Sequence, residues 1–170
     1  MIYSVYLSFG SNLSSKFGSP VDNIKQAYLE LLKYGFKIKK KSSFYKSVAY
    51  PNANDPEFIN SVVSITCHLE VEQLLKIILK IEKKFGRIRN KKNEPRILDI
   101  DIIDFNSKKL SIKNGNLNLK IPHEHLERRL FVLHPLREIN PNWQSPTNSK
   151  KISLIIAKNK INKDNKITKL

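Results

Sequence analysis

The chain has 170 residues, a formal net charge of +16 at pH 7 and one cysteine. This length favours a single domain whose core can fold without disulfide bonds or structural metals. One cysteine excludes an internal disulfide bridge. Because the chain also lacks the pattern of a secretion signal or a membrane span, we expect a cytoplasmic protein with no membrane partner. The domain should cover residues 1–157, followed by a loose, basic tail over residues 158–170.

The basic residues fall into two groups. Lysines are scattered along the whole chain, which is typical of compositional bias, although a basic surface attracts polyphosphates in general. The six arginines all lie between Arg87 and Arg137. Because a guanidinium group can bind phosphate through two parallel hydrogen bonds, this clustering suggests a phosphate site, with surface ion pairs as the alternative.

Alternation and capping signals predict the first elements. Residues 2–9 alternate between apolar and polar and predict a strand. The strand ends in Gly10-Ser11-Asn12, which is either a plain turn or a close approach of the backbone to a ligand. An N-cap serine and an N1 proline begin a helix over residues 19–35. Residues 36–46 then predict a second strand.

The next part of the chain repeats this order. Residues 47–56 form a loop marked by two prolines, and residues 58–69 predict a third strand. Residues 71–85 have the apolar spacing of an amphipathic helix. A basic loop over residues 87–92 leads to a fourth strand over residues 95–105.

Strand, helix, strand, strand, helix, strand is the βαββαβ order of a ferredoxin-like α+β sandwich. In this fold both helices cover one face of an antiparallel sheet. The remaining residues form a C-terminal extension, with a hairpin over residues 110–121 and helical material over residues 124–138 that Pro135 should interrupt. A short element over residues 152–157 should complete the domain.

Two carboxylates stand two residues apart in the fourth strand. Successive side chains of a strand alternate between its faces, so Asp99 and Asp101 should share one face while Ile100 points to the other. Like charges this close repel one another unless a cation lies between them. Carboxylate oxygens suit Mg²⁺, and Arg96 directly upstream suits a phosphate oxygen. A solvent-exposed face with two aspartates is the simpler alternative.

Several short motifs stand in a fixed order along the chain. They are Gly10-Ser11-Asn12-Leu13, Ser42-Ser43-Phe44-Tyr45, Pro56-Glu57-Phe58-Ile59-Asn60, Glu82 with Gly86-Arg87-Ile88-Arg89, Pro95-Arg96-Ile97-Leu98-Asp99-Ile100-Asp101, Ile121-Pro122-His123, and Arg128-Arg129-Leu130-Phe131-Val132-Leu133 with Pro135-Leu136 after it. Together and at these intervals they resemble the 6-hydroxymethyl-7,8-dihydropterin pyrophosphokinase family of folate biosynthesis. The resemblance covers about residues 2–144 and implies the βαββαβ core.

The resemblance implies an activity and a metal centre. The family is a Mg²⁺-dependent diphosphotransferase that moves a pyrophosphoryl group from ATP to the hydroxymethyl group of the dihydropterin and releases AMP. By this resemblance Asp99 and Asp101 are the ligands of two Mg²⁺ ions that bridge the triphosphate. Arg96 and the loop residues Arg87 and Arg89 are the phosphate clamp.

The same resemblance assigns the remaining ATP contacts. His123 and Arg129 match positions that hold the phosphates and the ribose. Leu75 and Ile102 match positions that line the adenine and ribose site, and Glu82 belongs to the ATP-binding set. The alternative is that His123-Glu124-His125 forms a surface turn. We do not expect a zinc site there, because no third and fourth ligand appears.

The resemblance also implies a pterin pocket. Phe58 and Phe131 match the two aromatic faces that sandwich the flat pterin, and Asn60 matches the amide that reads its hydrogen-bonding edge. Backbone groups near Ser47 and Tyr50 complete the pocket. Core aromatic residues and a strand-edge amide are the alternatives for these side chains.

Two other functions remain open at this point. An RNA-binding module shares the βαββαβ order and suits a basic chain, but it requires stacking aromatics in the Lys/Arg-Gly-Phe/Tyr context, which neither internal strand carries. A binding protein without catalysis would bind pterin or ATP and release no AMP. We expect a monomer that uses ATP and the dihydropterin and has no nucleic-acid partner.

Overall fold

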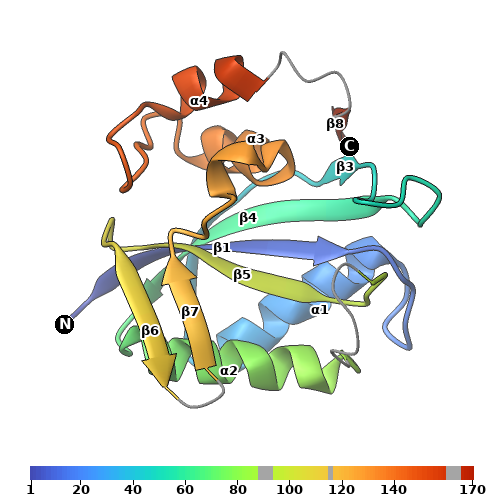
Figure 1. Ribbon diagram of the computed structural model, residues 1–170. Helices are drawn as coiled ribbons and strands as arrows, with labels where there is room; N and C mark the ends of the chain where they lie inside the picture. Colours follow the sequence, from blue (N-terminus) through green and yellow to red (C-terminus); the bar gives the residue numbers. More distant parts are fainter. Residues whose placement is uncertain (88–93, 115–116, 160–165) are drawn as a thin grey trace.

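A six-stranded antiparallel sheet forms the centre of the molecule (Figure 1). The computed structural model describes residues 1–87, 94–114, 117–159 and 166–170. The strand order is β5-β1-β4-β3-β8, and β2 also pairs with β4. The strands are β1 (Tyr3–Ser11), β2 (Lys37–Lys41), β3 (Tyr45–Ser47), β4 (Phe58–Cys67), β5 (Asp99–Phe105) and β8 (Ile167–Lys169).

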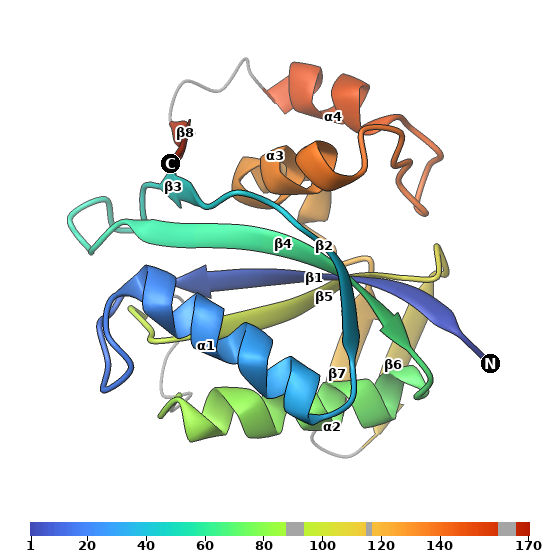
Figure 2. The ribbon, with the colours of Figure 1, turned by 180° about the vertical axis from the view of Figure 1, so that it is seen from behind.

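Two helices cover one face of this sheet, as the βαββαβ order predicts (Figure 2). They are α1 (Pro20–Lys33) and α2 (Val71–Lys84). A capping box between Ser19 and Asp22 begins α1, because each residue satisfies a backbone N–H of the other. The buried side chains of β1, every second residue from Tyr3 to Phe9, pack with both helices in the first core. The ferredoxin-like fold is therefore confirmed.

A second helical layer covers the opposite face (Figure 1). It contains the 3₁₀ turn η1 (Leu126–Arg128), α3 (Leu130–Ile139) and α4 (Ile152–Asn159). Side chains of this layer meet Val62 of β4 and Ile103 of β5 in a second core.

Pro135 does not interrupt α3, so that prediction was wrong. The residue lies inside the helix and is buried. A proline in a helix interior costs about 3 kcal/mol through its missing N–H and its ring. Burial of the apolar face, including Leu133 and Leu136, in the second core offsets this cost.

The hairpin prediction is confirmed, and the second strand differs from expectation. Strands β6 (Leu110–Asn114) and β7 (Leu117–Ile121) pair antiparallel in a separate two-stranded sheet. The predicted single strand over residues 36–46 is divided into β2 and β3, which pair with different parts of β4.

The predicted loose tail over residues 158–170 is described in two parts, residues 158–159 and 166–170, and its looseness stays a prediction. Residues 158 and 159 belong to α4, and Ile167–Lys169 form β8 on the edge of β3. Ile167 packs against the second core, and Lys169 Nζ lies 3.0 Å from Glu138 Oε1. These contacts order a segment whose own sequence has no strong strand pattern.

A β-bulge divides β5 into two parts. Leu7 of β1 lies opposite Ile102, but Tyr6 lies opposite Asp104, so Ile103 has no partner of its own. Both Ile103 and Asp104 consequently face the second helical layer, where Asp104 Oδ2 accepts a hydrogen bond from Trp143 Nε1 at 2.8 Å.

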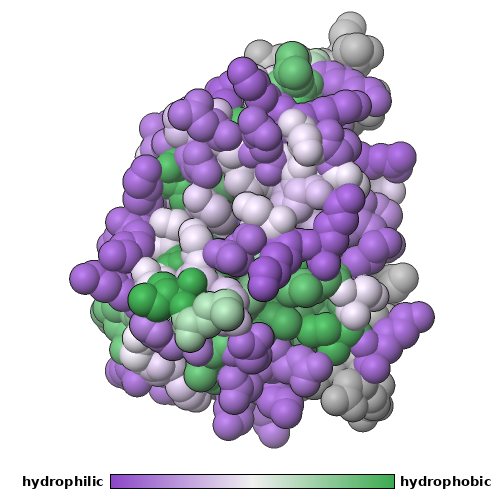
Figure 3. All heavy atoms as spheres, turned by 90° about the vertical axis from the view of Figure 1, so that its left-hand side faces the viewer, coloured by the Kyte–Doolittle hydropathy of each residue, from purple (hydrophilic) through white to green (hydrophobic). Residues whose placement is uncertain are grey.

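The surface is mainly hydrophilic on the side where the chain begins (Figure 3). Small apolar patches interrupt it, and Met1 and Ile2 are among the exposed apolar residues of the protein. In the ranges that the structure describes, no helix has the length and apolar character required to cross a membrane.

Candidate active site

The two aspartates of β5 lie on the same face of the sheet. Ile100 between them is buried in the first core, so Asp99 and Asp101 both point away from α1 and α2. Their partners on β1 are Gly10 and Ser8. The alternation of the strand therefore produces the carboxylate pair that the sequence predicts.

Guanidinium groups from three segments surround this pair. Arg87, after α2, forms ion pairs with Glu82 and Asp99. Arg96 Nη2 lies 2.7 Å from Asp99 Oδ2, and Arg129 Nη1 lies 2.9 Å from Asp101 Oδ2. Arg89, the other predicted clamp residue, lies outside the described residues.

The surroundings shift the pKa values of the two carboxylates in opposite directions. Burial acts to raise the pKa of Asp99, but Arg96 and Arg87 outweigh it and keep that pKa below its ordinary value. Burial raises the pKa of Asp101, the neighbouring Asp99 raises it further, and Arg129 offsets only part of this effect. A cation beside Asp101 would favour the charged carboxylate and so oppose this increase in its pKa.

Glu82 supports this arrangement from inside the protein. Its side chain is 2 % exposed, and Oε1 accepts a hydrogen bond from the backbone N–H of Ile100 at 2.8 Å. It therefore connects Arg87 to the backbone of β5 between the two aspartates. This burial makes Glu82 a positioning residue for the predicted ATP site, because its carboxylate is not accessible to a nucleotide.

Asn12 connects three segments around the site, a role that the sequence analysis missed. Its Oδ1 accepts from Arg96 N at 2.6 Å, its N donates to Arg96 O at 3.0 Å, and its Nδ2 donates to Pro56 O at 2.9 Å. The Gly10-Ser11-Asn12 motif was the available signal. Among the described residues, the buried Nε of Arg96 has no hydrogen-bond partner.

The aromatic residues of the predicted pterin pocket lie next to these arginines. The guanidinium carbon of Arg96 is 5.0 Å from the centre of the Phe58 ring, and that of Arg129 is 5.8 Å from the Phe131 ring. Each aspartate is thus connected through one arginine to one aromatic ring. Both contacts are within the range of cation–π attraction.

Gly10 lies between the aspartates and the pterin residues. A Cβ atom at this position would be 3.7 Å from both Asn60 Oδ1 and Phe58 Cδ1, and 3.9 Å from Asp99 Cβ. Asn60 is buried, and its Nδ2 donates to Ser47 Oγ at 2.9 Å and to Tyr45 O at 3.3 Å. The structure therefore brings Asn60, Ser47, Phe58 and the carboxylates together.

Three predicted residues lie apart from this group. Tyr50 is 82 % exposed in the loop before β4. The side chains of Ile102 and Leu75 pack in or against the first core, on the face opposite the aspartates. Only the backbone of Ile102 is placed where a ligand on the aspartate face could reach it.

His123 follows β7 and is uncharged at neutral pH. Burial, followed by the neighbouring Arg129, lowers its pKa to about 4. Its Nδ1 accepts a hydrogen bond from the backbone N–H of His125 at 3.0 Å. The proton of the neutral ring is consequently on Nε2, which makes this nitrogen a donor for an anionic ligand.

The donor set fits magnesium better than zinc. In the described ranges, no group of three or more histidine, cysteine or carboxylate side chains could hold a metal by itself. Mg²⁺ usually binds one or two carboxylates and completes its shell with waters and substrate phosphates. Asp99 and Asp101 provide such a pair, and the arginines around them are suited to the phosphates.

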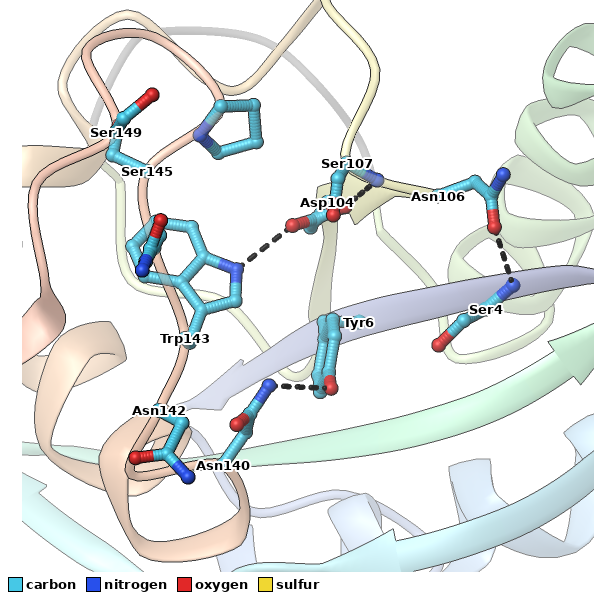
Figure 4. Close-up of a pocket in the computed structure, with 12 residues that line it drawn as sticks. Ser4, Tyr6, Asp104, Asn106, Ser107, Asn140, Asn142, Trp143, Ser145 and Ser149 are labelled. Carbon is cyan, nitrogen blue, oxygen red and sulfur yellow. Dashed lines mark hydrogen bonds between the residues drawn. The ribbon is translucent and has the colours of Figure 1, made fainter.

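A separate cavity of about 510 Å³ lies at the other end of β1 (Figure 4). Tyr6, Asp104, Asn140 and Trp143 are among its lining residues, and none of the predicted site residues lines it. Several of its polar groups bond to one another: Trp143 donates to Asp104, and Asn140 Nδ2 donates to the Tyr6 hydroxyl at 2.9 Å. This internal pairing indicates a structural role.

Fold and site together define a ferredoxin-like α+β domain in which two neighbouring carboxylates form ion pairs with arginine side chains. Residues 6–141 match the model of the 7,8-dihydro-6-hydroxymethylpterin-pyrophosphokinase family. The chain belongs to this family.

Curated relatives agree with this assignment. The 2-amino-4-hydroxy-6-hydroxymethyldihydropteridine pyrophosphokinase of Synechocystis is 39% identical over 145 residues, which cover 85% of this chain and 72% of that protein. The Aquifex aeolicus protein of the same name is 37% identical, with 84% of each chain covered. The folic acid synthesis protein FOL1 of Dictyostelium discoideum is 40% identical, but the match spans 20% of its length.

Solved structures support the fold. The Plasmodium falciparum HPPK-DHPS wild-type structure superposes with a TM-score of 0.72 at 17% sequence identity. The match covers 98% of this chain and 48% of that one, so this chain spans about half of that protein.

Proposed function

We propose that this protein transfers pyrophosphate from ATP to the hydroxymethyl group of 6-hydroxymethyl-7,8-dihydropterin in folate biosynthesis. The pterin hydroxyl oxygen bonds to the β-phosphorus of ATP, the bond from that phosphorus to the oxygen bridging the α-phosphate breaks, and AMP leaves. The hydroxyl proton passes to solvent. The products are AMP and the pterin diphosphate.

The convergence of two kinds of groups at Gly10 is the observation that supports this reaction most directly. Three side chains lie around this glycine. Asn60 and Phe58 are suited to a flat heterocycle, and Asp99 is suited to a metal ion bound to phosphate. Pterin and triphosphate can therefore meet in one place. The family match and the carboxylates, which would repel the backbone of a nucleic acid, favour this reaction over RNA binding.

Binding and orientation of the triphosphate are the proposed tasks of the arginines. Arg96 and Arg87 flank Asp99, and Arg129 flanks Asp101, so the phosphates would enter between groups that already alternate in charge. His123 adds an uncharged donor through Nε2. Arg89 completes the clamp in this proposal. Such preorganised donors stabilise phosphoryl-transfer transition states without side-chain acid or base catalysis.

Asp99 and Asp101 would hold two Mg²⁺ ions. When bound, these ions supply positive charge to the triphosphate and to the leaving oxygen. The pair of carboxylates on one face, with the pKa of Asp101 raised by burial and by Asp99, supports this assignment. The role of Glu82 in the proposal is to keep Arg87 and the β5 backbone in place.

The pterin would lie between Phe58 and Phe131, with Asn60, Ser47 and backbone groups near Tyr50 at its edge. The backbone of Ile102 remains a proposed adenine contact, whereas the Leu75 side chain packs against the first core and is no longer part of the proposal. Because all these residues come from one chain, we also propose an active monomer without a nucleic-acid partner. The free, buried thiol of Cys67 supports a cytoplasmic location.

Replacement of each aspartate by asparagine tests the metal role within this function. Asp99→Asn and Asp101→Asn should each lower the rate of AMP formation at saturating Mg²⁺ by about 10²-fold or more, the size of effect seen when one charge-stabilising group is lost. Pterin binding should be retained. Asp104→Asn is the matched control, because it makes the same change in the same strand away from the site. An unchanged rate in either site variant contradicts the metal role.

A further inference from the structure

Strand β8 makes β3 an internal strand of the sheet. β3 has three residues and pairs with β4 on one side. On its other side Tyr45 lies opposite Lys169, Lys46 opposite Thr168 and Ser47 opposite Ile167 (Figure 1). The last residue, Leu170, extends this contact by donating its N–H to Phe44 O at 2.9 Å. A very short strand that would otherwise be an edge is therefore paired on both sides.

Glu138 connects this strand pair to the end of α3. Its carboxylate accepts from Ser43 Oγ at 2.8 Å, from Ser43 N at 3.1 Å and from the Tyr45 hydroxyl at 2.8 Å. It also accepts from Lys169 Nζ of β8 at 3.0 Å. One side chain thus links α3, β3 and β8, and each contact is a charge-assisted hydrogen bond.

The residues connected in this way adjoin the proposed pterin pocket. Tyr45 O and Ser47 Oγ of β3, together with Phe58 O of β4, accept hydrogen bonds from the buried amide of Asn60 and so orient it. Phe131, one of the proposed stacking residues, lies on α3, seven positions before Glu138. A displacement of β3 would change the orientation of Asn60, and a displacement of α3 relative to β3 would change the distance between the pocket walls.

We propose that β8, through its pairing with β3 and through the Lys169–Glu138 ion pair, positions the pterin-binding edge and so determines affinity for the pterin. Lys169 and Glu138 are positioning residues, since neither belongs to the proposed contacts with substrate. The inference rests on the proposed function. It adds an element from outside residues 6–141, the part of the chain that matches the family model.

Removal of β8 tests this inference. A chain that ends at residue 165 and a Lys169→Met variant are compared with the full chain, and Thr168→Ala, an exposed neighbour in β8, is the matched control. The dissociation constant of 6-hydroxymethyl-7,8-dihydropterin is measured by fluorescence titration in the presence of Mg²⁺ and a non-hydrolysable ATP analogue. Affinity for the analogue alone is measured by calorimetry. Neither measurement requires turnover.

The dissociation constant of the pterin should increase about tenfold in the shortened chain, equivalent to about 1.4 kcal/mol. It should increase about threefold in Lys169→Met, while affinity for the ATP analogue changes less than about twofold. Thr168→Ala should match the full chain. Glu138→Gln, which keeps one acceptor oxygen, should retain more pterin affinity than Glu138→Ala, and neither variant should lose affinity for the ATP analogue to the same extent. A role only in overall stability would lower both affinities together.

Two results would overturn the inference. One is an unchanged pterin affinity in both the shortened chain and Lys169→Met. The other is an equal loss of affinity for pterin and for the ATP analogue, which would indicate general destabilisation. Lys169→Met keeps the whole backbone of β8, so it tests the ion pair even if the shortened chain fails to fold. A full chain that binds pterin and forms no AMP contradicts only the proposed reaction.

Discussion

Replacing Glu82 by glutamine should destabilise the protein strongly, although the two side chains have nearly the same shape. Glu82 is 2 % exposed, pairs with Arg87 and accepts the N–H of Ile100. Breaking a buried ion pair costs about 3–5 kcal/mol. Glutamine keeps an acceptor for Ile100, and Arg87 keeps its pair with Asp99, so we expect a loss of about 2–3 kcal/mol.

Urea unfolding followed by circular dichroism measures this loss. With a slope of about 2 kcal/mol per molar urea, the midpoint should fall by roughly 1–1.5 M. Glu57→Gln is the control, because its partner Lys46 and Glu57 itself are 43% and 48% exposed. Exposed pairs contribute at most about 1 kcal/mol and often nothing measurable. Equal midpoints for Glu82→Gln and the control would refute the structural role of Glu82.

Two further predictions concern other parts of the molecule. His123 should titrate in NMR spectra with a midpoint near 4, because burial and Arg129 lower its pKa to about 4. This folded-state pKa lies below the ordinary value of 6.5, so protonation of His123 should favour unfolding as the pH falls from 6.5 toward 4. An NMR midpoint near 6.5 would contradict the burial of the ring. Trp143→Phe removes the Nε1 donor to the buried Asp104 and should lower the free energy of unfolding in urea by about 1.5–3 kcal/mol, while AMP formation stays unchanged. A loss of activity at full stability would instead place the cavity of Figure 4 in the reaction.

The part of the site that the sequence predicts best depends on local geometry. Asp99 and Asp101 share a face because β5 alternates regularly at that point, and alternation is a property of any strand. Alternation alone would place Asp104 on the face opposite Asp99 and Asp101, but the bulge after Ile102 shifts the pattern by one residue and turns Asp104 to the same face. A bulge depends on how β1 and β5 pair, which periodicity in one strand does not reveal.

The roles of Asn12, Glu82 and β8 depend on contacts between distant segments. Asn12 bonds to Arg96 and Pro56, and Glu82 bonds to Ile100, so their functions become visible only when the segments are brought together. Residues 167–169 form a strand because β3 and Glu138 offer partners to them. Three residues are too few to show a strand periodicity, so tertiary contacts decide their conformation.

In the proposed reaction the carboxylates and arginines near Gly10 direct the pterin hydroxyl to the β-phosphorus of ATP. Phosphorus NMR of the purified protein with ATP, Mg²⁺ and 6-hydroxymethyl-7,8-dihydropterin distinguishes this attack from attack at the γ-phosphorus. We expect the ATP signals to be replaced in equal amounts by AMP and by the two coupled signals of a pterin diphosphate. Formation of ADP and a pterin monophosphate, or of no pterin phosphate at all, would contradict it.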